Sequence, residues 1–312
     1  LSNNISFSQH NANYNTLQYY SGSIYPESSS VNFVGGLQDN GTLIFTNNSL
    51  CNYNNDYLDV YNMISGGDGA YCFWDKNQPE LLITSTYYNR YYLFNNCEYV
   101  DYFNGNNGTF ISPADYDYDN NTLYANAVRF DGSAQNRLYR IGNIDDNPFD
   151  GNINLFTNTN VPFSSIKYSP YSSETRNLFI GTQSGYLFKV SFTSNNSFNL
   201  DNIGDDNFPM GNISSISIGG SEDTLMVTFS NYGISSVWLT NNAGETWIEK
   251  ESNIPDMPVR WSLFHPSSSN HALLATEIGI WGTENLQEEN TMWYPYNANL
   301  ANVRVDMIKI RE

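Results

Sequence analysis

Charged side chains are scarce in this 312-residue chain, and positive ones are the scarcest. Only 14% of residues are charged, and 13 Lys and Arg face 32 Asp and Glu, for a net charge of −19. Such an acidic surface repels phosphate groups, so we expect neither nucleic acid nor anionic lipid as a partner. Cationic ligands, metal ions and neutral glycans remain open.

Long hydrophobic runs are also missing. No segment approaches the roughly 18 apolar residues that a membrane-spanning helix needs, so we expect no membrane insertion. The chain begins at Leu1 and shows no signal peptide. That absence is uninformative, because a processed protein has already lost such a segment.

Cysteine and histidine occur three times each. The cysteines are Cys51, Cys72 and Cys97, and no Cys-x-x-Cys or Cys/His spacing indicates a zinc site. In a secreted protein an odd count leaves at least one thiol unpaired. Two possibilities stay open at this point: a bridge between Cys51 and Cys72 on neighbouring strands, or three buried free thiols.

Helical periodicity is nearly absent, and aromatic and turn-forming residues take its place. Aromatics reach 15%, with 24 Tyr and 18 Phe, and Asn occurs 47 times. Tyr, Phe and Thr suit pleated strands, whereas Asn, Gly and Asp suit the turns between them. The composition predicts many short strands joined by tight loops, with no helix longer than about two turns.

A strand-turn-strand theme recurs along the chain. Its six copies are residues 25–45, 74–94, 111–130, 168–190, 217–239 and 264–281, and their starts lie 49, 37, 57, 49 and 47 residues apart. Periods near 40–50 residues are typical of four-stranded propeller blades. We therefore predict an all-β protein, a β-propeller of six or seven blades with eight as the upper limit, rather than a sandwich pair or a β-solenoid.

The two chain ends bear on how such a ring closes. We treat residues 1–312 as a single propeller domain and as a fragment of a longer chain. Residues 4–20 could supply strands that close the ring. A C-terminal strand over residues 303–308 could belong to a partial blade completed by residues outside this chain.

The sharpest local motif is TNNAGETW at residues 240–247. It fits the Asp-box pattern at Thr240, Asn242, Gly244, Thr246 and Trp247. Asn242 can accept backbone N–H bonds across a hairpin, and Gly244 can take a positive φ there. Because Trp247 would then pack beneath the turn, we assign the motif a structural role on the rim of a blade.

Four further segments make the resemblance specific: GGLQDNGT at 35–42, GGDGAYCFWD at 66–75, NIPDMPVRW at 253–261 and ALLATEIGIW at 272–281. With the Asp-box they resemble secreted Bacteroidetes propellers that carry sortilin-like or sialidase-type Asp-box (BNR) repeats. The resemblance covers nearly the whole chain. It implies a secreted or cell-surface protein, often a type IX secretion substrate, in a superfamily that includes sortilin-type receptors and xyloglucan-cleaving glycosidases.

The glycosidase branch supplies an enzyme hypothesis. Asp39 in LQDNG and Glu277 in ATEIG occupy analogous turns of two blades. Two carboxylates converging near the propeller axis could serve as acid and base on a glycosidic bond. In another blade the same place holds Gln183, which favours a structural slot that accepts any polar side chain.

Other candidates concern ligands and metal ions. Asp68, within a glycine-rich turn, could project into the central mouth or cap its own turn, and Arg260 with Trp261 could form a ligand platform or pack on the rim. Asp115, Asp117 and Asp119 alternate like the first half of a calcium loop, but the glycine and distal glutamate of such a loop are missing. These residues therefore predict either a calcium site, with calcium as the possible cofactor, or a solvated turn.

We expect a non-catalytic extracellular or cell-surface binding module, an adhesin or a domain that recognises a glycan or protein. Aromatic rings stack on sugars, and amides bond to hydroxyls. One alternative is a glycoside hydrolase with paired carboxylates, so enzyme activity stays open. The other is a structural component whose open C-terminal edge joins further subunits of a surface assembly. Sialidase activity is disfavoured, because no arginine cluster for a substrate carboxylate is evident.

Overall fold

In the computed structural model the chain forms six sheets, each of four antiparallel strands. The structure describes residues 17–311 except 28–31, 47–60, 130, 132–135, 156–160, 172–174, 195–196, 205, 207 and 299. No helix occurs within these residues. The predicted all-β class and four-stranded blades are therefore confirmed, with six sheets in the described part of the chain.

The first three sheets follow one another without exchange of strands. Blade 1 contains β1 (Tyr19–Ile24), β2 (Phe33–Leu37), β3 (Gly41–Phe45) and β4 (Tyr61–Ser65). Blade 2 contains β5 (Gly69–Trp74), β6 (Leu81–Thr86), β7 (Arg90–Asn95) and β8 (Glu98–Asn104). Blade 3 contains β9 (Ala114–Asp117), β10 (Thr122–Asn126), β11 (Arg137–Gly142) and β12 (Phe149–Asn154).

The other three sheets repeat this order. Blade 4 contains β13 (Phe163–Tyr168), β14 (Arg176–Thr182), β15 (Leu187–Phe192) and β16 (Phe198–Asn202). Blade 5 contains β17 (Ile213–Ile218), β18 (Leu225–Phe229), β19 (Val237–Thr240) and β20 (Ile248–Glu249). Blade 6 contains β21 (Val259–His265), β22 (Ser268–Thr276), β23 (Gly279–Thr283) and β24 (Tyr294–Pro295).

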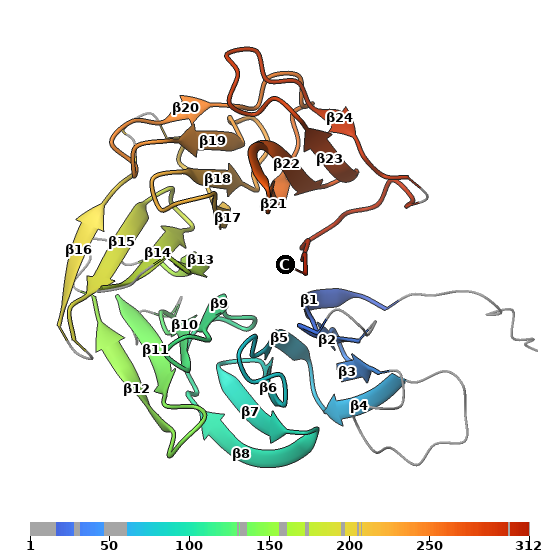
Figure 1. The fold of residues 1–312 in the computed structure, drawn as a ribbon, viewed down its shortest axis with the longest axis vertical. Helices are drawn as coiled ribbons and strands as arrows, with labels where there is room; N and C mark the ends of the chain where they lie inside the picture. The colour runs from blue at the N-terminus through green and yellow to red at the C-terminus, as the bar shows by residue number, and fades with distance from the viewer. Residues whose placement is uncertain are drawn as a thin grey trace, which may run out of the picture.

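The six sheets are arranged radially around a common axis (Figure 1). The first strand of each blade lies closest to the axis and the fourth lies at the outside. Hairpins between second and third strands therefore lie at the same end of the ring as the connections between blades. The bond from the Tyr88 backbone N to the Phe110 carbonyl (3.1 Å) joins two such loops. We call this end the loop face.

Asparagine sets the geometry of many turns. Left-handed backbone conformations with φ between 42° and 55° occur at a series of asparagines: Asn89, Asn96, Asn106, Asn121, Asn136, Asn143 and Asn147. Asn tolerates this region better than most residues because its short side chain can bond to the nearby backbone. The high Asn content is thus explained in part by the number of tight connections.

Buried asparagines also link blades 2, 3 and 4. Asn89 Nδ2 donates to Asn107 Oδ1 and to the Asn126 carbonyl, at 2.7 Å each. Asn126 Oδ1 in turn accepts the backbone N–H groups of Val128 and Phe163, at 3.1 and 3.2 Å. A buried amide left unpaired would cost about 1–3 kcal/mol, so this network fixes the connections of the loop face.

The hydrophobic core is divided among the interfaces between blades. Five clusters of buried side chains join blades 1–2, 2–3, 3–4, 4–5 and 5–6. Between blades 2 and 3, for example, Ile83 and Leu93 pack with Leu123 and Tyr139. No sixth cluster joins blade 6 to blade 1 within the described residues, and Figure 1 shows an open sector between these two sheets.

The C-terminal residues cross this open sector. Residues 303–311 leave blade 6 and run to the axis, and no strand is formed over them (Figure 1). The prediction of a strand at 303–308 is therefore wrong. The segment pairs with no strand in the described part of the chain. Of the predicted closing segment 4–20, residues 1–16 lie outside the described residues.

The cysteines differ from both alternatives left open by the sequence. Cys97 is disulfide-bonded, whereas Cys72 is a buried free thiol. A bridge between Cys51 and Cys72 is therefore wrong, and so is the idea of three free thiols. Cys51 lies outside the described residues. The free thiol packs in the core between blades 1 and 2, where burial raises the pKa of Cys72 to about 12.

Candidate functional site

The turn at residues 240–247 in blade 5 is held by its own side chains. Asn242 Oδ1 accepts the Thr240 hydroxyl (2.8 Å) and the Thr246 backbone N–H (3.0 Å). The Gly244 N–H donates to Thr240 Oγ1 (3.1 Å), and Gly244 has φ of 93°. These contacts satisfy polar groups within a tight turn.

Trp247 anchors this turn to the preceding connection. The indole is 8% exposed, and its Nε1–H donates to the Ile203 carbonyl at 2.8 Å. Its ring lies 5.0 Å from that of Phe208, nearly edge-on. The residue therefore stabilises the contact between blades 4 and 5.

Blade 6 contains a second turn of the same construction, which sequence reasoning missed. Thr283 Oγ1 donates to Asn285 Oδ1 (2.8 Å), and that oxygen also accepts the Met292 N–H (3.0 Å). Trp293, which is fully buried, donates its Nε1–H to the Lys250 carbonyl (2.8 Å). The Asn-to-Trp spacing is five residues in blade 5 and eight in blade 6, so a fixed-spacing pattern does not find it.

Arg260 and Glu277 form an ion pair on blade 6. Arg260 Nη2 and Nε lie 2.6 and 3.0 Å from Glu277 Oε2. Asp306 of the C-terminal segment lies 3.8 Å from Arg260 and pairs with Arg304 at 2.7 Å. The guanidinium and carboxylate thus compensate one another, and Glu277 accepts from a permanent cation.

Trp261, the other half of the predicted platform, is covered in part by the C-terminal segment. Lys309 Nζ lies 5.1 Å from the centroid of its ring, within the range of a cation–π contact. The protein atoms around the axis, together with the nearby cations Lys167 and Lys76, lower the pKa of Lys309, although its side chain is exposed to solvent. Arg260 and Trp261 therefore serve in part as a surface on which residues 303–311 dock.

The structure brings Asp39 and Asp68 together in blade 1. The Asp39 backbone N–H donates to Asp68 Oδ1 at 2.9 Å, across 29 residues of sequence. Burial raises the pKa of Tyr20, and the charges of Asp68 and Asp39 raise it further. Asp68 thus joins two loops of the loop face.

Asp39 and Glu277 occupy equivalent hairpins, as the sequence suggested, but in blades 1 and 6 on either side of the open sector. Asp39 has φ of 59° in the β2–β3 hairpin, and Glu277 lies in the β22–β23 hairpin. Among the contacts of the described residues none joins the two carboxylates. The paired-carboxylate arrangement stays a prediction.

Asp115, Asp117 and Asp119 each have protein donors. Asp115 accepts Lys167 Nζ (3.0 Å) and the Tyr168 N–H, while Asp117 accepts the Asn120 N–H (2.9 Å) and closes its own turn. Asp119 accepts Asn77 Nδ2 (3.0 Å) and the Tyr168 hydroxyl. No group of three or more potential metal ligands occurs in the described part of the chain, and calcium binding here stays a prediction.

An aromatic cluster on the loop face was not expected from the sequence. The rings of Tyr87 and Phe110 stack with centroids 5.6 Å apart, and Tyr88 lies edge-on to both. Arg90 covers Tyr87. Tyr88 has φ of 57°, a conformation that bulky residues rarely adopt and that occurs preferentially at functional positions.

Further exposed apolar side chains lie on other loops of the same face. The whole set comes from hairpins and connections in blades 2, 4, 5 and 6 and from the connections that precede blades 3 and 5: Tyr88, Phe110, Tyr186, Met210, Tyr232 and Ile278. Isolated exposed hydrophobics need no explanation, but several on one face are typical of a binding surface. In the sequence, only the aromatic residues within the predicted loops pointed to this surface.

Comparisons with known proteins add no identification. No protein-family model matches the chain, and no curated protein matches it. No helix that could cross a membrane is found among the residues that the structure describes.

Proposed function

We propose that this propeller is a non-catalytic extracellular binding module whose loop face recognises glycans. The observation that carries the proposal is the group of exposed aromatic side chains on that face, led by Tyr88, Phe110 and Tyr232. Sugar rings present C–H faces that stack on aromatic rings, while amides of neighbouring loops bond to hydroxyls. Asn106, exposed in the same connection as Phe110, supplies one such amide.

Two further features support a binding role over hydrolysis. Glu277 is held in an ion pair by Arg260, so its carboxylate is already occupied by a protein partner. Asp39 and Asp68 meet through a backbone N–H that fixes the loops. Of the two candidate carboxylates, that of Glu277 is therefore engaged in an ion pair, whereas Asp39 contributes its backbone N–H to the loop contact.

An extracellular location is supported by the disulfide at Cys97, because disulfides persist in oxidising compartments. We also propose that the turns at 240–247 and 283–293 belong to the Asp-box class. Their threonine, asparagine and tryptophan make matching hydrogen bonds, in line with the resemblance to secreted sortilin-like propellers.

A glycan array probed with the purified chain tests the proposal. We expect binding to a restricted set of neutral glycans, weakened at least ~tenfold by Tyr88→Ala or Phe110→Ala. Tyr99→Ala is the matched control: Tyr99 is an exposed aromatic residue on β8, at the outside of blade 2, and its loss should leave binding unchanged. No binding to any glycan, or equal weakening by Tyr99→Ala, would refute the assignment.

A further inference from the structure

Blade 6 has one packed face and one face turned toward the open sector. Phe264, Leu274 and Trp281 point into the core shared with blade 5. The opposite face, offset by one residue along each strand, lines a cavity of about 390 Å³ whose walls include Leu263, Leu273, Tyr294, Tyr296 and Ile310. Tyr294 and Tyr296 are 60% and 64% exposed. Within the described part of the chain, no sheet neighbours this largely apolar face.

Blade 1 presents a second such face across the same sector. Val34 and Ile44 point toward blade 2 and are buried. On the other side of the sheet the rings of Phe33 and Phe45 stack with centroids 5.0 Å apart, and Met63 is 62% exposed. The two sheets that flank the open sector are therefore both apolar on the sides that face it.

The C-terminal segment lies between these faces, in the place that an innermost strand would take. The Val305 N–H donates to the Thr276 carbonyl on the loop face, at 3.0 Å. The segment then runs to the axis (Figure 1). Lys309 Nζ lies 5.1 Å from the centroid of the Trp261 ring, and Ile310 lines the cavity. Each of the six inner strands pairs with a second strand, whereas residues 306–311 pair with none in the described part of the chain.

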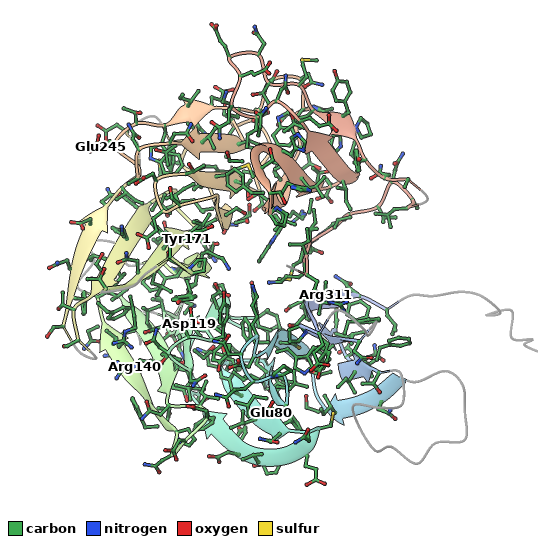
Figure 2. All side chains as sticks on the ribbon, viewed as in Figure 1. Glu80, Asp119, Arg140, Tyr171, Glu245 and Arg311 are labelled. Carbon is green, nitrogen blue, oxygen red and sulfur yellow. The ribbon has the colours of Figure 1, made fainter. Side chains whose placement is uncertain are left out.

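The charge of this segment is opposite to that of the whole molecule. Arg304 pairs with Asp306, but Lys309 and Arg311 are in no ion pair within the described residues. Arg311 lies near the axis beside blade 1 (Figure 2), and its Nε is buried without a hydrogen-bond partner. Across the interface of blades 3 and 4, Lys167 pairs with Asp115 of the neighbouring inner strand. A neighbour with carboxylates would satisfy Lys309 and Arg311 in the same way.

We propose that the open sector is a docking site for an antiparallel β-sheet of another polypeptide, apolar on both faces and acidic where it meets Lys309 and Arg311. One of its strands would pair with residues 305–311 and add a seventh blade by β-augmentation. Its faces would continue the five existing blade interfaces onto blades 6 and 1. A glycan fits poorly here. The flanking sheet faces are apolar, and the C-terminal segment offers backbone N–H and C=O groups of the kind that an edge strand presents to another strand.

The test uses the 312-residue chain and a synthetic hairpin of about 16 residues with an Asn-Gly turn. Valine and isoleucine occupy both of its faces, and two glutamates lie at one end. A second hairpin carries lysines in place of the glutamates. Calorimetric titration measures each peptide against the parent chain, Lys309→Glu and Ile308→Pro. Arg137→Glu on blade 3 is the control variant.

We expect the acidic hairpin to bind the parent chain with a stoichiometry of one to one. Lys309→Glu should weaken it at least ~tenfold and improve binding of the lysine hairpin. Ile308→Pro should weaken both, because proline removes a ladder N–H, and Arg137→Glu should change neither. Circular dichroism and the melting temperature check that the variants remain folded.

Three results would overturn the proposal. The first is no binding of the acidic hairpin at about 1 mM. The second is equal binding of both hairpins to the parent chain. The third is self-association of the chain, seen by sedimentation, that Ile308→Pro abolishes, since a second copy would then be the occupant. Because none of these readouts involves the loop face, they are independent of the glycan proposal.

Discussion

Trp293 occupies in blade 6 the position that Trp247 occupies in blade 5. Each indole donates its Nε1–H at 2.8 Å to a backbone carbonyl that precedes its own blade, at Lys250 and Ile203 respectively. Each is also preceded by an asparagine whose side-chain oxygen accepts a backbone N–H at 3.0 Å. The turn thus couples the third and fourth strands of one blade to the previous blade, and the three extra residues in blade 6 leave this coupling intact.

We predict that Trp247→Ala and Trp293→Ala each lower the free energy of unfolding by about 3–5 kcal/mol, as for other buried aromatics. Trp293 is fully buried and should lie at the upper end of this range. Urea denaturation followed by far-UV circular dichroism measures both. Tyr232→Ala, a change on an exposed loop, is the control and should cost less than about 0.5 kcal/mol. An unchanged midpoint for Trp293→Ala would show that the two turns are not equivalent.

Glu222 predicts a pH dependence at the interface of blades 4 and 5. Burial raises the pKa of its carboxyl, but hydrogen bonds from Ser169, Asn177 and Lys189 outweigh burial and leave the pKa lowered. A carboxyl with a lowered folded-state pKa stabilises the fold above its unfolded pKa of about 4.3, and loses this contribution as pH falls through the folded value. Glu222→Gln should therefore cost about 1–2 kcal/mol at pH 7.

The measurement compares the parent and Glu222→Gln by urea denaturation from pH 7 to pH 3. The difference between them should shrink below about pH 4, because the parent carboxyl then becomes protonated. Glu245→Gln serves as control, since Glu245 is exposed on the 240–247 turn (Figure 2). A difference that stays constant over the whole pH range would contradict the hydrogen bonds to Glu222 and its ion pair with Lys189 (2.9 Å).

Cys72 should be chemically inert in the folded protein. Its thiol is 2% exposed and its pKa is raised to about 12 by burial, so almost no thiolate is present at pH 8. Iodoacetamide followed by peptide mapping should leave Cys72 unmodified without denaturant and label it fully in 6 M guanidinium, about the concentration that unfolds very stable domains. Rapid labelling of the native protein would show that the interface of blades 1 and 2 opens.

The repeat in the sequence predicted the architecture because each blade uses the same order of short strands and turns. Inner strands begin at residues 19, 69, 114, 163, 213 and 259, so the blades are more evenly spaced than the sequence copies suggested. The copy at 111–130 contains β9 and β10 but ends before β11, which follows at Arg137. A longer loop between these strands had displaced the alignment and produced the uneven intervals of 37 and 57 residues.

The candidate site was less predictable, since it depends on which blades become neighbours. Periodicity places Tyr88 and Phe110 in loops, but only the fold brings their rings together. Likewise no local pattern pairs Arg260 with Glu277, because a β-bulge lies between Val259 and Trp261 at that end of β21. The open sector could not be predicted either. Apolar residues alternate in β2 and β22 in the same way whether or not another sheet covers the faces of these strands.

The last prediction concerns the two carboxylates on which the enzyme hypothesis depends. Asp39→Asn combined with Glu277→Gln should leave glycan binding within about twofold of the parent, and under the proposed binding function we expect no hydrolysis by either protein. Glu277 pairs with Arg260 in a partly exposed position, so loss of that ion pair should cost no more than about 1 kcal/mol. The Asp39 turn depends on its backbone N–H, which the substitution retains. Neutral Gln183 fills the equivalent hairpin of blade 4, so this turn needs no charge.

Parent and double variant should both be assayed against β-glucan, xyloglucan and sialylated substrates by release of reducing sugar or sialic acid. Hydrolysis by the parent that disappears in the double variant would replace the binding module with a glycoside hydrolase, and would place its acid and base on the two blades that border the open sector.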